Sequence, residues 1–147
     1  MTEVTIRLAA VGDAPAIASL AGQLGYPTTV SQAADRLGPL LANGDQAFFV
    51  AELEGGEVIG WIHGYITRLV ESEPFAELGG FVVDEHHRGG GVGRKLLNAT
   101  EDWIRERNVK KFRIRSRVDR AGAHAFYERL GFSVTKDQRI FDKILRP

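Results

Sequence analysis

A glycine-rich stretch decides how this sequence folds: Arg88-Gly89-Gly90-Gly91-Val92-Gly93-Arg94. It stands between a run of β-forming residues and an amphipathic helical pattern. Glycines allow positive φ and let a ligand approach without a Cβ in the way, while the first N–H groups of the helix have no partner within it. The helix dipole adds positive charge at that end. The stretch therefore predicts a cradle for a phosphate group, flanked by two arginines.

Two familiar phosphate motifs do not fit these letters. A dinucleotide fingerprint needs G-x-G-x-x-G, and a P-loop needs G-x-x-x-x-G-K-[ST]. Counted from Gly89 or Gly91, the last glycine of the fingerprint falls on Arg94 or Leu96, and Gly93 is followed by Arg94-Lys95-Leu96. The stretch predicts a phosphate-bearing ligand that is held without a metal.

The pattern of apolar residues on either side predicts alternating strands and helices. The helices are expected from the Asp13 N-cap to Gly25 and over 31–43, 93–107 and 120–130. The strands are expected over residues 4–9, 47–53, 58–69, 77–83, 111–118, 132–135 and 140–145. The order β-α-α-β-β-β-α-β-α-β-β predicts an α/β fold with helices on both faces of a mixed sheet.

Length and composition set the broad class of the protein. The chain has 147 residues, which suits one domain over residues 1–147, and 44% of them are hydrophobic. It has no cysteine, so disulfides, thiolate metal sites and a cysteine nucleophile are excluded. No apolar run approaches the length of a membrane span, and the N-terminus lacks a signal-peptide pattern. We expect a cytoplasmic protein without a membrane partner.

The charges are divided unevenly along the chain. The net charge is zero, yet residues 1–87 carry −9 and residues 88–147 carry +9. Such a division predicts two partners of opposite charge. A nucleic-acid module would use the basic run 105–120, but that run lacks interleaved aromatic residues and a helix-turn-helix signal. We therefore expect no nucleic-acid partner.

Two motifs together resemble the GCN5-related N-acetyltransferase (GNAT) family. Residues 88–93 match its Arg/Gln-x-x-Gly-x-Gly/Ala motif, and residues 116–132 are similar to its second motif, with the core Ala123-His124-Ala125-Phe126-Tyr127. The expected order of elements agrees along the whole chain. The resemblance implies the GNAT fold with a mostly antiparallel sheet of six to seven strands, and an acetyl-CoA-dependent N-acetyltransferase as the activity.

The resemblance also implies where acetyl-CoA binds. In the family it lies where two central strands splay apart, here 77–83 and 111–118. The backbone of Phe81, Val82 and Val83 would pair with the pantetheine arm, and the glycine stretch would hold the pyrophosphate. Asp119 stands where the family often has asparagine. The implied cofactor-binding residues are Phe81, Val82, Val83, Arg88, Gly89, Gly90, Gly91, Val92, Gly93, Arg94, Asp119 and Tyr127.

Three residues receive catalytic roles from the resemblance. The backbone N–H of Phe81 would face the thioester oxygen, which gains charge when an amine attacks. Tyr127 would act as the general acid that protonates the departing thiolate. Glu77 is the candidate general base, because it lies eleven positions before Arg88, as in histone-type members. The absence of cysteine excludes an acetyl-cysteine relay, so direct attack in a ternary complex is expected.

The acceptor is expected to be a primary amine. Acceptor residues in the family come from the first two helices and from the loop after the third strand, here Tyr26, Glu73 and Phe75, and His63 and Tyr65 could line the same pocket. Candidates are a small amine or amino sugar, an amino acid derivative, or a protein amino group. A non-catalytic acyl-CoA sensor with the same fold is the alternative reading. Family members are often homodimers, and the sequence does not decide this.

Overall fold

The computed structural model describes residues 3–147, which divide into two compact units, one up to Arg115 and the other Ser116–Pro147. The first unit holds a five-stranded sheet and three helices, and the second holds one helix followed by an extended segment. The prediction of a single domain over 1–147 is not tested by this division. Among the described residues, no helix is long and apolar enough to cross a membrane.

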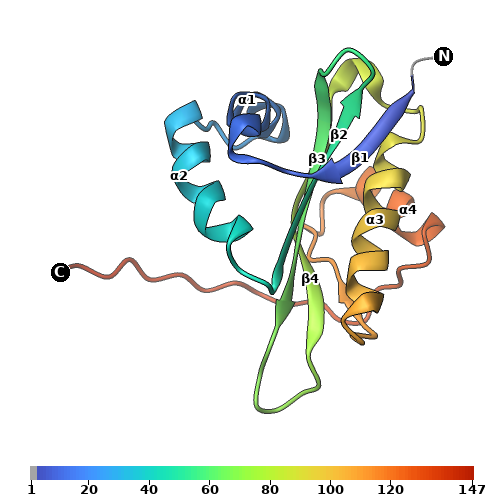
Figure 1. The fold of residues 1–147 in the computed structure, drawn as a ribbon. Coiled ribbons are helices and arrows are strands. Elements are labelled where there is room, and N and C mark those ends of the chain that lie inside the picture. The colour runs from blue at the N-terminus through green and yellow to red at the C-terminus, as the bar shows by residue number, and fades with distance from the viewer. Residues whose placement is uncertain (1–2) are drawn as a thin grey trace. The chain divides into compact units, whose positions relative to one another are not determined.

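The sheet of the first unit follows the chain order β1-β2-β3-β4-β5 (Figure 1). The first four strands pair antiparallel, and β5 pairs with β4 in parallel. The strands are β1 (Val4–Leu8), β2 (Gln46–Leu53), β3 (Val58–Thr67), β4 (Phe75–Val83) and β5 (Phe112–Arg113). The mixed, mostly antiparallel sheet of the sequence-based prediction is thereby confirmed.

Helices cover both faces of this sheet. Helices α1 (Ala14–Leu24) and α2 (Val30–Leu41) pack on one face, where Ile17 and Leu37 join Phe48, Val50 and Trp61 in one apolar cluster. Helix α3 (Val92–Glu106) packs on the other face, where Trp103 and Ile104 meet Ala47, Ile66 and Ala76. Figure 1 shows α1 and α2 on the opposite side of the strands from α3. Burial of these two apolar layers holds the sheet in place.

Short local signals mark the ends of these helices. Asp13 stands at the N-cap of α1 as expected, but its side chain makes no capping hydrogen bond, and α2 begins at Val30 rather than at the expected residue 31. Gly25 ends α1 with a φ of 102°, a value that glycine adopts without strain. Thr29 caps α2, because its side chain accepts a hydrogen bond from the Gln32 backbone N–H and the Gln32 side chain accepts one from the Thr29 N–H. Two 3₁₀ turns, η1 (Val11–Asp13) and η2 (Glu85–His87), lead into α1 and toward α3.

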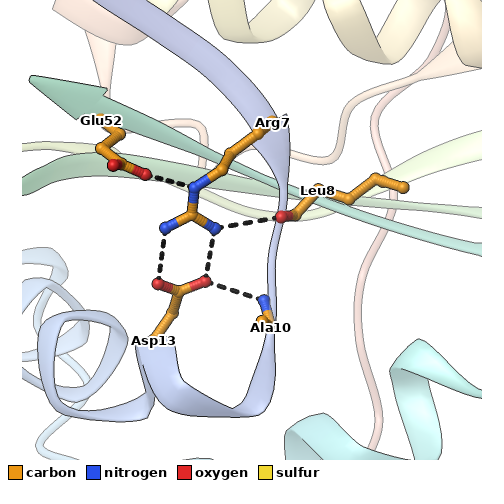
Figure 2. A network of polar contacts seen from close by, with 5 residues as sticks. All are labelled: Arg7, Leu8, Ala10, Asp13 and Glu52. Atoms are coloured by element: carbon orange, nitrogen blue, oxygen red, sulfur yellow. Dashed lines mark hydrogen bonds and ion pairs between the residues drawn. The ribbon is translucent and has the colours of Figure 1, made fainter. Parts of the chain in front are cut away.

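One arginine joins the first strand to its neighbours (Figure 2). The Arg7 guanidinium donates to both carboxylate oxygens of Asp13, at 2.8 and 2.9 Å, and to the Glu52 carboxylate. Asp13 also accepts from the Ala10 backbone N–H at 2.8 Å. The hydrogen bonds from Arg7 lower the pKa of Asp13 in spite of its partial burial. This network fixes the turn between β1 and α1.

The second unit contains α4 (Ala121–Arg129), followed by residues 131–147 without helix or strand. The helix agrees with the prediction over 120–130, and Gly131 follows it with a φ of 95°. The Tyr127 ring lies between two phenylalanine contacts, with centroid distances of 5.8 Å to Phe126 and 6.1 Å to Phe132. These aromatic contacts anchor the start of the last segment to α4.

The expected number of strands, six to seven, is wrong for the described residues, which contain five. Residues 132–135 and 140–145 form no strand, and the strand expected over 111–118 pairs with β4 only at Phe112 and Arg113. A strand exists only where its backbone finds a partner, and an apolar pattern in the sequence does not supply one. The apolar pattern of these segments was therefore not sufficient to predict strands.

Candidate active site

The two central strands separate beyond a short shared ladder. Strands β4 and β5 pair only at Ala76 with Phe112 and at Glu77 with Arg113, whereas β4 continues to Val83. The segment 81–83, expected to contact the pantetheine arm, therefore lies on β4 past the point where β5 ends. The short ladder fits the strand separation that the predicted acetyl-CoA position requires, and that position stays a prediction.

A bulge and two glycines shape β4 at this opening. The pairing of β3 with β4 shifts between His63 and Gly64, so Gly79 is the extra residue on β4. A Cβ at Gly79 would lie 2.7 Å from His63 Nδ1, and one at Gly80 would lie 2.8 Å from the Trp61 ring. Only glycine fits beneath these two rings. The neighbouring strand residue Phe81 carries the backbone N–H that we expect to face the thioester oxygen.

The glycine turn has the geometry of an anion cradle. Gly89 and Gly91 both have a φ of 85°, and no atom lies within 4 Å of a Cβ built on either. Gly91 is the N-cap of α3 and contributes no capping side chain, so the first N–H groups of the helix have no intrahelical acceptor. The flanking Arg88 and Arg94 are exposed. These features fit the diphosphate of CoA, and neither arginine needs to leave a buried partner to reach it.

A polar clamp fixes the chain just before this turn. The Asp84 carboxylate accepts hydrogen bonds from Gln23 Nε2 on α1 and interacts with His87 Nδ1, both at 2.8 Å. The Gln23 amide oxygen in turn accepts from the Glu85 backbone N–H at 2.9 Å. The hydrogen bonds from Gln23 and His87 lower the pKa of Asp84 to about 2. Helix α1 thereby fixes the start of the glycine turn, through a contact that no sequence pattern indicated.

Glu77, the candidate base, is buried on β4 and has two side-chain partners. The residue is 6% exposed; one oxygen accepts from Thr67 Oγ1 at 2.5 Å and the other from Arg115 Nε at 2.8 Å. Burial alone would raise the pKa of Glu77, but the hydrogen bonds from Thr67 and Arg115 outweigh it and lower the pKa. The carboxylate is therefore ionised at neutral pH.

His63 and Tyr65 lie on the same face of the sheet as Glu77. Tyr65 is the cross-strand partner of Glu77, and burial together with the Glu77 charge raises its pKa. His63 lies two residues earlier on β3, stacks on Phe48 at 5.4 Å and makes a 2.6 Å hydrogen bond with Gln46. Burial lowers the pKa of His63, so the ring is neutral at pH 7. The structure thus brings three of the predicted site residues together.

The other expected acceptor residues have different surroundings. Tyr26 is 69% exposed between α1 and α2, and Glu73 is exposed in the loop before β4. Phe75 is buried, and the Lys111 and Arg113 side chains lie over its ring at 4.7 and 4.5 Å from the centroid. Acceptor binding by these residues stays a prediction. The Phe75 ring also packs against the Lys111 and Arg113 side chains.

Tyr127 and Asp119 belong to the second unit. Burial raises the pKa of Tyr127, so its hydroxyl keeps its proton well above neutral pH. Asp119 forms a 3.0 Å ion pair with Arg117, whose carbonyl also contacts His124 Nε2 at 2.8 Å. The roles of both residues toward acetyl-CoA stay predictions.

No sequence pattern indicated two residues that contact Glu77: Thr67 and Arg115. The two-residue period of a strand would have placed Thr67 on the face of His63 and Tyr65. Arg115 lies in the strand expected over 111–118, but the sequence did not indicate that it reaches Glu77. Pairing across strands that are distant in the chain created this contact.

Comparison with known proteins identifies the family. The family model "Acetyltransferase (GNAT) family" matches residues 20–132. The chain belongs to the GNAT acetyltransferases. An aminoglycoside N(6')-acetyltransferase type 1 of Stenotrophomonas maltophilia is 34% identical over 97% of this chain and 95% of its own. This acetyltransferase therefore uses acetyl-CoA as its co-substrate and transfers the acetyl group to nitrogen.

Solved structures of similar proteins have the same fold. The aminoglycoside N-acetyltransferase AAC(6')-Iy in complex with CoA has a TM-score of 0.86 at 20% identity, over 97% of this chain and 96% of that one. The aminoglycoside 6'-N-acetyltransferase AAC(6')-Ih of Acinetobacter baumannii has a TM-score of 0.84 at 19% identity, over 97% and 99% of the two chains. At these identities the likeness supports the fold, which confirms the predicted fold class.

Proposed function

We propose that this acetyltransferase moves the acetyl group of acetyl-CoA to a primary amine of a small cationic amino sugar, the 6' amine of an aminoglycoside, by direct attack in a ternary complex. The observation that carries the choice of acceptor is the 34% identity, over nearly both full chains, to an aminoglycoside N(6')-acetyltransferase. The net charge of −9 on residues 1–87, which contain α1, α2 and the loop before β4, also suits a polycation.

The donor side of the proposal rests on the glycine turn and on β4. Acetyl-CoA supplies an acetyl group activated as a thioester. The N–H groups at the start of α3, with Arg88 and Arg94, would bind its diphosphate, and 81–83 would hold the arm along β4. The Phe81 N–H would stabilise the negative charge that develops on the thioester oxygen during attack.

Glu77 is our proposed proton acceptor. Its ionised carboxylate lies on the sheet face shared with Tyr65 and Thr67, at the end of the ladder where β4 and β5 separate. A carboxylate with a lowered pKa does not deprotonate a free ammonium ion efficiently. The carboxylate can accept the proton once the nitrogen is bonded to the acetyl carbon, because that bond makes the N–H strongly acidic. The amine must therefore arrive uncharged.

Tyr127 is our proposed proton donor. The hydroxyl would give its proton to the thiolate as the carbon–sulfur bond breaks. After product release Glu77 would lose its proton to water and the Tyr127 phenolate would take one from water, which restores the enzyme. Burial favours the protonated hydroxyl, because it raises the pKa of Tyr127 above its ordinary value. No cysteine exists to form an acetyl-enzyme, which favours direct transfer.

Substitution of Tyr127 separates this function from a non-catalytic sensor. We expect Tyr127→Phe to lower kcat by roughly 10- to 100-fold, because one proton donor is lost. The affinity for acetyl-CoA should stay within about threefold, because the ring still packs on Phe126 and Phe132. The measurements are the release of free CoA with an amino-sugar acceptor and calorimetric binding of acetyl-CoA.

The control is Glu128→Gln, an exposed neighbour on α4, which should leave both quantities unchanged. Unchanged turnover in Tyr127→Phe would remove the acid role from this residue. Tight acetyl-CoA binding by the unmodified protein without CoA release, over a broad panel of amines and peptides, would favour the sensor.

A further inference from the structure

Two consecutive glycines make β4 pliable just past its short ladder with β5. Gly79 is the extra residue of the bulge, where the ladder with β3 is interrupted, and Gly80 follows it directly. Glycine restricts the backbone least, and a bulge leaves the extra residue outside the ladder. The next residue is Phe81, whose N–H we assign to the thioester oxygen. A donor stabilises a developing charge most effectively when it is held in position beforehand. The strand therefore needs a support at these two glycines.

Backbone hydrogen bonds on either side of the bulge define the direction of the Phe81 N–H. In a strand, the N–H groups of successive residues point to opposite edges. The Ala76 N–H donates to Lys111 O, next to β5, at 2.8 Å. The Asp84 N–H donates to Ile59 O on β3 at 2.7 Å, although Asp84 and Ala76 are an even number of residues apart. The bulge has therefore reversed the alternation, and Phe81, an odd number of residues before Asp84, directs its N–H away from β3 and toward the β5 side.

Trp61 on β3 supplies a support at this place. The residue is buried, and a Cβ on Gly80 would lie only 2.8 Å from the outer carbons of its ring. The ring therefore lies directly against the Gly80 backbone. At its other end the indole Nε1–H donates to Ile17 O of α1 at 3.2 Å, and the Phe48 ring packs on it with 5.1 Å between centroids. Helix α1 and strand β2 thus hold the ring on which Gly80 rests.

We propose that Trp61 is a positioning residue for acetyl transfer: its ring fixes Gly80 and thereby aims the Phe81 N–H at the thioester oxygen. The inference rests on the role of Phe81 in the proposed function. His63 lies against Gly79 from the same strand and limits the movement of the bulge in the same way. Trp61 acts through the strand and not by contact with acetyl-CoA. Its effect therefore falls on the chemical step, in which charge develops on the oxygen, more than on binding.

The direct readout is the infrared stretching frequency of the thioester carbonyl, measured on bound acetyl-CoA that carries an isotope label at the carbonyl carbon. No acceptor is present. A hydrogen bond to the oxygen weakens the C=O bond and lowers the frequency. Phenylalanine lacks the outer ring carbons that meet Gly80 and the N–H that donates to Ile17. We expect Trp61→Phe to raise the frequency and to lower kcat about 10- to 100-fold, while the KM for acetyl-CoA stays within about threefold.

Trp103→Phe is the matched control. Trp103 is as buried as Trp61, both at 8% exposure, but it belongs to α3 and packs on the other face of the sheet. The same substitution there removes a similar amount of packing and should leave the frequency and kcat unchanged. A compensating variant is Gly80→Ala added to Trp61→Phe. Its Cβ occupies the space of the lost ring carbons, so the frequency and kcat should return toward the values of the unmodified protein.

Three results would overturn the inference. The first is an unchanged frequency and kcat in Trp61→Phe. The second is an equal loss of kcat in Trp103→Phe, because general destabilisation would then explain both variants. The third is a carbonyl frequency that binding to the unmodified protein does not alter, which would remove the Phe81 role from the proposed function as well. Because the spectra are recorded without an acceptor, they do not depend on which amine the enzyme acetylates.

Discussion

Glu77 illustrates how a single side chain obtains its properties from neighbours that are remote in sequence. The residue is buried, which by itself would favour the neutral carboxylic acid. Thr67 from β3 and Arg115 from beyond β5 donate to its two oxygens and reverse that preference. Glu77 is therefore a buried, ionised carboxylate opposite Tyr65. Such a carboxylate suits the acceptance of a proton from an amine nitrogen that has become acidic by bonding to the acetyl carbon.

This environment predicts the pH dependence of the reaction. A lowered pKa keeps Glu77 deprotonated throughout the neutral range, and a raised pKa keeps Tyr127 protonated there. Between about pH 6 and pH 9, kcat/KM should therefore rise only because the acceptor amine loses its proton. Glu77→Gln should lower kcat about 100-fold without moving this rise. Initial rates over that range provide the measurement.

The control for Glu77→Gln is Glu54→Gln, which removes an exposed carboxylate from the turn between β2 and β3. Its rates should match those of the unmodified protein. Full activity of the Glu77→Gln variant would show that the carboxylate is not the proton acceptor in the form proposed. A shifted midpoint in the pH profile of this variant would show the same.

Sequence patterns identify those candidate residues that lie in a family motif or follow the two-residue alternation of a strand. Glu77, His63 and Tyr65 are such residues, and the structure places them on one face of two neighbouring strands. Arg115, Gln46 and Gln23 could not be found in this way. Their partners are Glu77, His63 and Asp84, and these contacts arise only when separate strands and helices come together.

Among the elements, α3 and its glycine turn were the most predictable. The pattern placed the helix over 93–107, and the structure has it over Val92–Glu106. Local sequence determines this helix: glycines supply the positive φ at its start, and the amphipathic pattern supplies its buried face. Strand β5 and the segments after α4 were less predictable, because a strand depends on a partner outside its own sequence.

Substitutions at the start of α3 should weaken acetyl-CoA binding selectively. Gly91→Ala puts a Cβ on a residue with a φ of 85°, and Arg94→Glu places a negative charge beside the expected diphosphate. We expect each change to raise the KM for acetyl-CoA about 10-fold or more, while the KM for the amine stays nearly constant. Steady-state kinetics with one substrate varied at a time tests this.

Lys110→Glu makes the same change of charge at an exposed residue beyond the other end of α3, and should leave the KM for acetyl-CoA unaltered. An unchanged KM in both Gly91→Ala and Arg94→Glu would contradict the assignment of the diphosphate to the glycine turn. A fall in kcat without a change in KM would place the residues in the chemical step instead.

At the scale of the whole molecule, the uneven charge acquires a physical interpretation. The +9 half begins at Arg88, the first residue of the glycine turn, and would attract the phosphates of acetyl-CoA. The −9 half contains α1, α2 and the loop before β4, and would attract a cationic acceptor. Net charge alone, which is zero, concealed this division. The family and the mixed sheet followed from the sequence, whereas the specificity for an acceptor depends on loops that no motif describes.

One measurement tests the central claim most directly: mass spectrometry of the products formed from acetyl-CoA and two matched aminoglycosides. The two acceptors differ only at the 6' position, which carries an amine in one and a hydroxyl in the other. We predict one acetyl group on the 6' nitrogen of the first acceptor, with an equal amount of free CoA, and no transfer to the second. Equal acetylation of both acceptors, or of neither while a peptide amine is acetylated, would contradict the proposed function.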